Sequence, residues 1–180
     1  ASGGLLFPMG VGISHNDLYW ADMTSGKVSR RSLDGGPIED VVTGENMPTC
    51  VAVDSDGGVV YWVNYGDGMV KGRSVDLSDS VREVATGLSA PYGVVVDKTN
   101  RKLFWSNAIS STIQRWDLGA WGTAPEPFLS GLNQPIGLAV DAGTAKLYWV
   151  SNGNQLVHRH NLDGSGTSES VTSCGKAYYV

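Results

Sequence analysis

The sequence predicts an all-β fold, a β-propeller of four four-stranded blades in one domain, and three observations support this. One aromatic motif recurs four times along the 180 residues, and 24 glycines and 7 prolines favour short strands joined by tight turns. The repeat length, about 43 residues, is that of one propeller blade. The copies of the motif are Leu18-Tyr19-Trp20, Val60-Tyr61-Trp62, Leu103-Phe104-Trp105 and Leu147-Tyr148-Trp149.

Each copy contains four predicted strands. The first is apolar and follows a proline, the second contains the aromatic motif, the third opens eight residues after the tryptophan, and the fourth is weaker. Third strands open at Val28, Val70, Ile113 and Val157, and the fourth strands are expected at 40–42, 82–84, 127–129 and 169–171. The blades are therefore expected at 8–47, 48–90, 91–134 and 135–180.

The tryptophans of the motif are expected to belong to the core. Side chains alternate between the two faces of a strand, so a Tyr-Trp pair sends one ring to each side of its blade, where neighbouring blades pack. Burial of each ring would contribute roughly 2 to 3 kcal/mol. Packing is thus the first explanation for Trp20, Trp62, Trp105 and Trp149.

Charge and composition exclude several classes of function. The net charge is −5, and the 13 Lys and Arg residues are scattered, which argues against nucleic acid. No apolar run approaches the roughly 20 residues of a spanning helix, so membrane insertion is not expected. The first residues lack the form of a signal peptide, which indicates a mature or trimmed chain. Cys50 and Cys174 are the only cysteines. Either they form a disulfide or both are free thiols, and two free thiols are the preferred interpretation.

The repeat resembles the YWTD, or LDL-receptor class B, family of extracellular receptor regions and nidogen-like proteins. The clearest traces are Tyr19-Trp20-Ala21-Asp22, the segment Gly137–Asp141 and the segment Asn161–Gly164. The resemblance covers nearly the whole chain. It implies a β-propeller that binds protein ligands and has no catalytic activity.

Two features depart from the family. Its propeller has six blades and this chain supplies four, so either a four-bladed ring, a larger ring closed by oligomerisation, or a fragment is expected. The signature Asp survives only as Asp22 and is replaced by Asn64, Asn107 and Ser151. Polar contacts between blades are therefore expected to differ from those of the family.

Two columns of the third strands carry the candidate site residues. The first column holds Arg30, Gly72, Arg115 and Arg159, and the second holds Arg31, Arg73, Trp116 and His160. The second column is interpreted either as a set of repeated ligand pockets or as bulk that fills the wedge between blades. Trp121 lies in a loop without a counterpart in other repeats, and loops on rigid scaffolds often carry binding residues. The predicted ligand-binding residues are Trp116, Trp121, Arg31, Arg73 and His160.

No catalytic residue, metal ligand or cofactor is predicted. Signature motifs of hydrolases, phosphate-binding loops and zinc proteases are absent from the sequence. His158 and His160 share a strand face, but a third ligand is not evident. A lactone hydrolase-like propeller enzyme needs inward-pointing carboxylates, whereas equivalent inner positions hold Gly10, Cys50, Gly93 and Gly137.

The expected function is a secreted, extracellular recognition module. The first interpretation is a lectin with repeated glycan sites, and the alternative is a receptor-type propeller that binds a protein ligand; a storage protein is a third. Homo-oligomers are compatible with the repeats. The sequence contains no Asn-x-Ser/Thr acceptor, so N-glycosylation is not expected.

Overall fold

The computed structural model describes residues 5–173, and this part of the chain contains sixteen strands in four antiparallel sheets. The all-β fold with four four-stranded blades is thereby confirmed. Blade 1 holds β1 (Pro8–Ser14), β2 (Asp17–Asp22), β3 (Lys27–Ser32) and β4 (Glu39–Thr43), and blade 2 holds β5 (Pro48–Asp54), β6 (Val59–Asn64), β7 (Met69–Ser74) and β8 (Arg82–Ala85). Blade 3 holds β9 (Pro91–Asp97), β10 (Lys102–Asn107), β11 (Thr112–Asp117) and β12 (Glu126–Leu129), and blade 4 holds β13 (Pro135–Asp141), β14 (Lys146–Ser151), β15 (Leu156–Asn161) and β16 (Glu169–Ser173).

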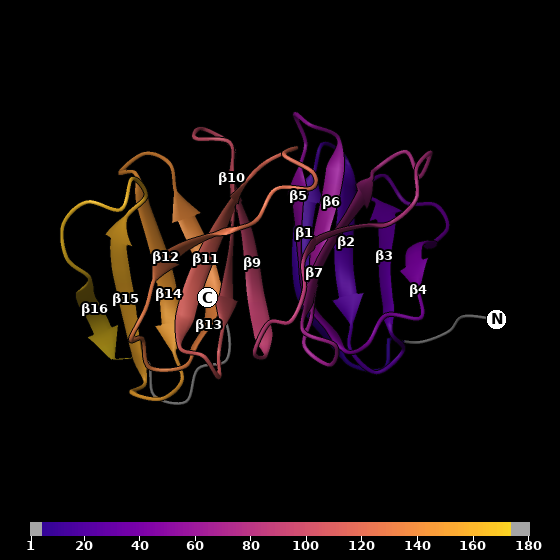
Figure 1. Ribbon diagram of the computed structural model, residues 1–180. Coiled ribbons are helices and arrows are strands. Elements are labelled where there is room, and N and C mark those ends of the chain that lie inside the picture. Colours follow the sequence, from indigo (N-terminus) through magenta and orange to yellow (C-terminus); the bar gives the residue numbers. More distant parts are fainter. Residues whose placement is uncertain (1–4, 174–180) are drawn as a thin grey trace.

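Every blade is a meander in which consecutive strands pair, as Figure 1 shows. The register repeats from blade to blade: Trp20 lies opposite Val11, and Trp62 lies opposite Val51. The first strands all begin at one end of the molecule, which we call the proline end, and the turns between second and third strands lie at the same end. We call the opposite end the far end.

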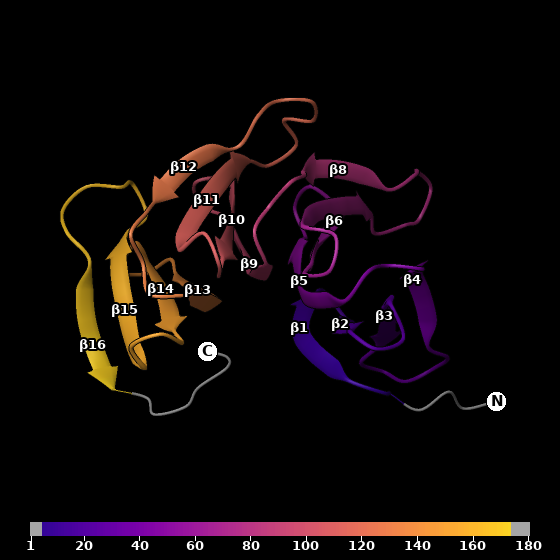
Figure 2. The same ribbon diagram turned by 60° about the horizontal axis from the view of Figure 1, so that its bottom comes forward.

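The blades form an arc rather than a closed ring. The inner strands pack in the order β1, β5, β9, β13, and Figure 2 shows β4, β8, β12 and β16 on the outer rim. Blade 1 and blade 4 do not pack against each other as neighbouring blades do, and Val11 on β1 is 65% exposed. Of the closures that the sequence leaves open, the four-bladed ring is thus not adopted by residues 5–173, in which β1 and β13 do not pack as neighbouring inner strands do.

Small residues let the inner strands approach closely. A Cβ atom at Gly10 would lie 2.6 Å from the Cα of Cys50, and one at Gly93 would lie 2.3 Å from the carbonyl oxygen of Ile136. Any side chain at these positions would push adjacent blades apart. The glycines of the inner positions are therefore a packing requirement of the arc.

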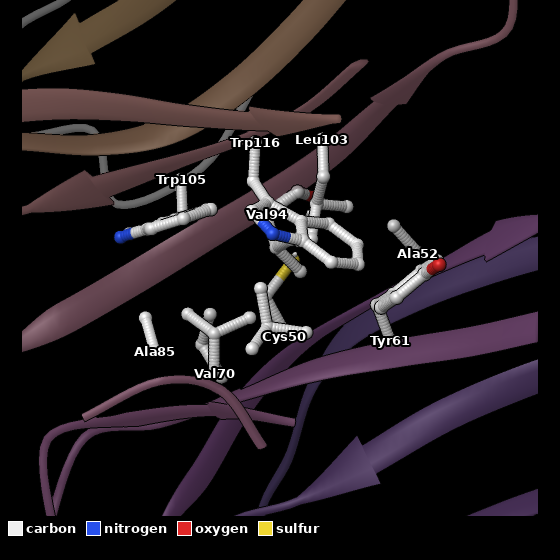
Figure 3. Close-up of a cluster of buried hydrophobic side chains, with 11 residues drawn as sticks. Cys50, Ala52, Tyr61, Val70, Ala85, Val94, Leu103, Trp105 and Trp116 are labelled. Atoms are coloured by element: carbon white, nitrogen blue, oxygen red, sulfur yellow. Dashed lines mark hydrogen bonds between the residues drawn. The ribbon is translucent and has the colours of Figure 1, made fainter. Parts of the chain in front are cut away.

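The core consists of layers between blades. Trp62, Trp105 and Trp149 are at most 1% exposed, and each packs towards the preceding blade. Figure 3 shows the layer between blades 2 and 3, in which Cys50 and Tyr61 of blade 2 pack with Val94 and Trp116 of blade 3. The predicted packing role of these tryptophans is confirmed. The alternation of faces along each strand explains it, because the aromatic partner of each Trp points towards the following blade.

Cys50 is a free, buried thiol in this layer, and it donates a hydrogen bond to the carbonyl oxygen of Val94 at 3.6 Å. Burial raises the pKa of the thiol above its ordinary value. Cys174 lies outside the described residues. Within residues 5–173 there is also no helix of the length and hydrophobicity needed to cross a membrane.

Candidate functional site

The two third-strand columns point in opposite directions around the arc. Arg30 donates to the carbonyl oxygen of Val75 in the following blade, whereas Arg73 donates to the carbonyl oxygen of Val41 in the preceding blade at 2.8 Å. Neighbouring residues of a strand face opposite sides, so each column serves one interface. Residues of the second column therefore belong to the packing against the preceding blade.

Three predicted site residues of this column fill the wedge between blades. Trp116 is 2% exposed and His160 is 5% exposed, and each lies edge-on to a ring of the blade it packs against, Tyr61 or Phe128. Arg73 donates to three carbonyl oxygens and is half-buried. The interpretation as repeated ligand pockets is not supported for these three, because their polar groups and rings are used within the interfaces. Only Arg31 of the column is exposed, on the outer face of blade 1.

Trp121 comes from the loop between β11 and β12 and lies against blade 2. Its ring is stacked on that of Tyr61, with centroids 6.1 Å apart, and contacts the edge of Trp116 at 5.3 Å. The guanidinium of Arg82 lies 4.9 Å from the centre of the Trp121 ring. The indole thus connects blade 3 to blade 2, a packing role that its sequence position did not indicate.

Blade 2 is adapted to receive this ring. In blades 1, 3 and 4 the first column is an Arg that pairs across strands with a Glu, as in the Arg115–Glu126 pair at 3.0 Å. In blade 2 the same positions hold Gly72 and Arg82. A Cβ atom at Gly72 would lie 3.0 Å from Trp121 and 2.7 Å from Tyr61, so only glycine leaves room for the indole.

A polar hollow of about 350 Å³ borders Trp121 at the far end, between blades 2 and 3. Arg82 pairs with Asp79 at 2.5 Å, and Arg101 pairs with Asp54 at 2.8 Å, so the two guanidinium groups are balanced by carboxylates. The hydroxyl of Tyr61 is buried without a hydrogen-bond partner of good geometry. Its burial, together with the nearby carboxylate of Asp54, raises the pKa of Tyr61. Whether Trp121 and Arg31 contact a ligand stays a prediction.

A second hollow lies at the proline end, and sequence reasoning missed it. It has a volume of about 240 Å³ and spans blades 2, 3 and 4, and we call it the Tyr65 hollow. Its lining is Tyr65, Ala90, Tyr92, Ala108, Ile109, Gln134, Ile136 and Asn152. Ile109 is 72% exposed and Tyr65 is 37% exposed, although both lie in turns where polar residues are usual. These large residues at turn positions were the signal in the sequence that could have indicated the hollow.

The turns of three blades hold the residues of the Tyr65 hollow in place. The rings of Tyr65 and Tyr92 meet edge to face with centroids 6.2 Å apart. The backbone N–H of Ala108 donates to Ala90, and that of Asn152 donates to Gln134, at 2.9 and 3.0 Å. These bonds tie each turn to the connection that precedes its own blade. The hollow is therefore a preformed surface whose walls are aromatic and apolar, with two amide residues, Gln134 and Asn152.

The central channel offers few groups for chemistry. Its hollow of about 420 Å³ is lined largely by apolar residues and glycines of β1, β5 and β9, with Lys98 as the charged residue. Among residues 5–173 no three His, Cys, Asp or Glu side chains lie close enough together to hold a metal ion.

Comparison with known proteins places the chain among β-propellers. Low-density lipoprotein receptor-related protein 5 of Mus musculus is 31% identical over 113 residues, which are 61% of this chain and 7% of the receptor. The chain thus spans a small part of that relative. No family model matches the sequence.

Solved structures agree on the fold. A chain in the crystal structure of the nidogen/laminin complex superimposes with a TM-score of 0.84 at 23% identity, covering 95% of this chain and 66% of that chain. A gluconolactonase of Xanthomonas campestris superimposes with a TM-score of 0.75 at 14% identity, covering 91% of this chain and 62% of the enzyme. The sequence match to the receptor and the higher structural match to the nidogen/laminin complex confirm the resemblance of the four repeats to YWTD, or LDL-receptor class B, β-propellers.

Proposed function

We propose that the chain is a non-catalytic, extracellular recognition module that binds a protein ligand through the Tyr65 hollow. The observation that carries the proposal is the exposure of Ile109 and Tyr65 around a preformed hollow made by three blades. Aromatic and large apolar anchors on a rigid surface are typical of protein-binding hot spots. The similarity to a receptor-related protein and to a chain of the nidogen/laminin complex supports the same class of function.

The packing of the third strands favours a protein ligand over a glycan. The glycan interpretation relied on near-equivalent sites in each blade, and Trp116 and His160 are buried between blades. Trp121 is partly buried, and its ring packs on Tyr61 and Arg82 of blade 2. The Tyr65 hollow, in contrast, leaves its apolar groups accessible to a partner.

The similarity to a gluconolactonase is one of fold. The residues that line the central channel of this chain suit a structural role better than catalysis. Hydrolysis on a propeller axis requires carboxylates or amides that converge on the channel. Here the lining consists mainly of apolar side chains and glycines, with Lys98 and with Cys50, whose thiol has a raised pKa and is hydrogen-bonded to a carbonyl oxygen.

An array experiment tests the class of ligand. The purified chain is applied to an array of secreted and cell-surface ectodomains, laminin included, and in parallel to a glycan array. Binding to at least one ectodomain that is lost in Ile109→Asp supports the proposal. Binding to glycans alone, or ectodomain binding that Ile109→Asp leaves unchanged, would overturn it.

A further inference from the structure

The polar hollow at the far end, between blades 2 and 3, contains a buried hydroxyl group that the packing of the blades does not use. Tyr61 is 0% exposed, and its hydroxyl oxygen has no hydrogen-bond partner of good geometry among residues 5–173. The backbone N–H of Gly119 approaches this oxygen as a donor, so the hydroxyl proton itself is left without an acceptor. Because a buried donor without an acceptor costs free energy, this hydroxyl group indicates a role other than packing.

The other blades show that the repeat does not require a hydroxyl group at this position. In blade 1 the hydroxyl of the equivalent Tyr19 interacts with Arg30 of the first column, and blade 4 repeats this pair. Blade 3 has Phe104 at the same position, fully buried in the layer with blade 4, so the ring alone satisfies the packing. Blade 2 combines Tyr61 with Gly72 in the first column, and its hydroxyl group borders the hollow instead of an Arg of its own column.

Two guanidinium groups line the same hollow. Arg82 donates from Nη2 to Asp79 at 2.5 Å, and Arg101 donates from Nη1 to Asp54 at 2.8 Å. A guanidinium group carries five N–H donors, so each ion pair uses one donor and leaves others for a further acceptor. Both positive charges act on the ionisation of Tyr61, which places them near its hydroxyl group. The hollow is therefore richer in hydrogen-bond donors than in acceptors.

Neighbouring residues keep these donors in place and the hollow open. The Arg82 guanidinium lies 4.9 Å from the centre of the Trp121 ring, in addition to its pair with a carboxylate. A Cβ atom at Gly57 would lie 2.3 Å from Oδ2 of Asp54 and 3.2 Å from Nη2 of Arg101, so glycine leaves room for this ion pair. The volume of about 350 Å³ falls in the range of roughly 300 to 1,000 Å³ that is typical of small-molecule sites.

We propose that the polar hollow at the far end binds a small oxyanion, a carboxylate, phosphate or sulfate group, between Arg82, Arg101 and the hydroxyl group of Tyr61. Planar guanidinium groups match the oxygens of such anions, and hydrogen bonds to a charged acceptor are stronger than those between neutral groups. The carboxylates of Asp54 and Asp79 orient the two guanidinium groups and balance their charge, so hydrogen-bond donors rather than net charge hold the anion. This site lies at the opposite end of the molecule from the Tyr65 hollow and does not depend on protein recognition there.

Thermal unfolding in sodium acetate, sodium phosphate and sodium sulfate tests the site, with sodium chloride at the same ionic strength as the reference. An anion that binds only the folded state raises the unfolding midpoint with concentration, and this dependence gives its dissociation constant. At least one of the three anions is expected to stabilise the wild type. Tyr61→Phe and Arg82→Gln are each expected to raise the dissociation constant at least about tenfold, because a hydrogen bond to a charged group is lost. Tyr148→Phe removes the equivalent hydroxyl from blade 4 and is expected to bind like the wild type.

The difference between wild type and variants is the decisive result. Phosphate and sulfate also stabilise folded proteins because they are excluded from the surface, and this effect is common to all variants. Urea unfolding in chloride checks that Tyr61→Phe is as stable as the wild type, as Phe104 in blade 3 leads us to expect. Arg82 is exposed, so Arg82→Gln keeps the fold and provides an independent test. Equal stabilisation of the wild type and both variants by every anion, or no stabilisation of the wild type beyond that in chloride, would overturn the proposal.

Discussion

Gly72 illustrates how one residue adapts a repeat to its neighbour. Its column holds an Arg in the other three blades, and the absence of a side chain lets Trp121 lie against Tyr61. The sequence shows that Gly72 breaks its column and that Trp121 has no counterpart in other repeats. It does not show that the two irregularities meet, because they are joined only by packing between blades 2 and 3.

Substitution Gly72→Ala tests this contact. The added Cβ would overlap the rings of Tyr61 and Trp121, and overpacking of this kind costs about 1 to 3 kcal/mol of the free energy of unfolding. Chemical denaturation followed by tryptophan fluorescence measures the change. Gly143→Ala is the control, because a Cβ there meets only the side chain of Asp141 at 3.3 Å, and a small effect is expected. Equal stability of Gly72→Ala and the wild type would contradict the packing of Trp121.

Asp22, the one signature Asp that this chain retains, holds the segment before β1 in place. The carboxylate of Asp22 accepts hydrogen bonds from the backbone N–H groups of Leu6 and Phe7 and from that of Ser25. Burial acts to raise the pKa of Asp22, but these hydrogen bonds outweigh it, so the pKa is lower than the ordinary 3.8. Asp22 thereby fastens the start of blade 1 to the turn between β2 and β3.

A pH dependence follows for Asp22. Because its pKa is lower in the folded state, the charged form stabilises the fold above about pH 4, and this contribution disappears as the pH falls through the folded pKa. Asp22→Asn is expected to cost about 1 to 3 kcal/mol at neutral pH, as for the loss of a hydrogen-bonded charge. Urea unfolding at several pH values should show that the stabilities of the wild type and the variant converge over the pH range below the ordinary pKa of 3.8. A difference that stays constant down to this range would contradict the role of the carboxylate.

Elements were predictable from the sequence where local pattern determines them. Proline followed by an apolar run marks β5, β9 and β13, and the aromatic motif marks β6, β10 and β14, all as the structure has them.

The candidate site was less predictable, because the alternation of side chains along a strand does not say which face is an interface. Trp116 and His160 could therefore be either ligand-binding residues or bulk between blades until the neighbouring blade was placed. The Tyr65 hollow was missed because its residues come from turns of three different blades.

At the scale of the whole molecule, the arrangement of the blades determines which blade faces have a neighbouring blade. Four blades occupy an arc, which leaves the apolar outer face of blade 1 and the outer face of blade 4 without neighbours among residues 5–173. No local pattern in the sequence specifies this angle, since it results from the fit of every layer together. The same arc brings the turns of blades 2, 3 and 4 close enough at the proline end to form the Tyr65 hollow.

The central claim, protein recognition at the Tyr65 hollow, is tested most directly by titration of the ectodomain that the array identifies. The dissociation constants of the wild type, Ile109→Asp and Val81→Asp are measured by calorimetry. Ile109 is 72% exposed and Val81 is 36% exposed at the far end, so both variants should fold. A charge on a hot-spot anchor costs about 2 kcal/mol or more, so Ile109→Asp is expected to weaken binding at least about tenfold while Val81→Asp binds like the wild type. Equal affinities of the three proteins, or a larger loss in Val81→Asp, would contradict the account.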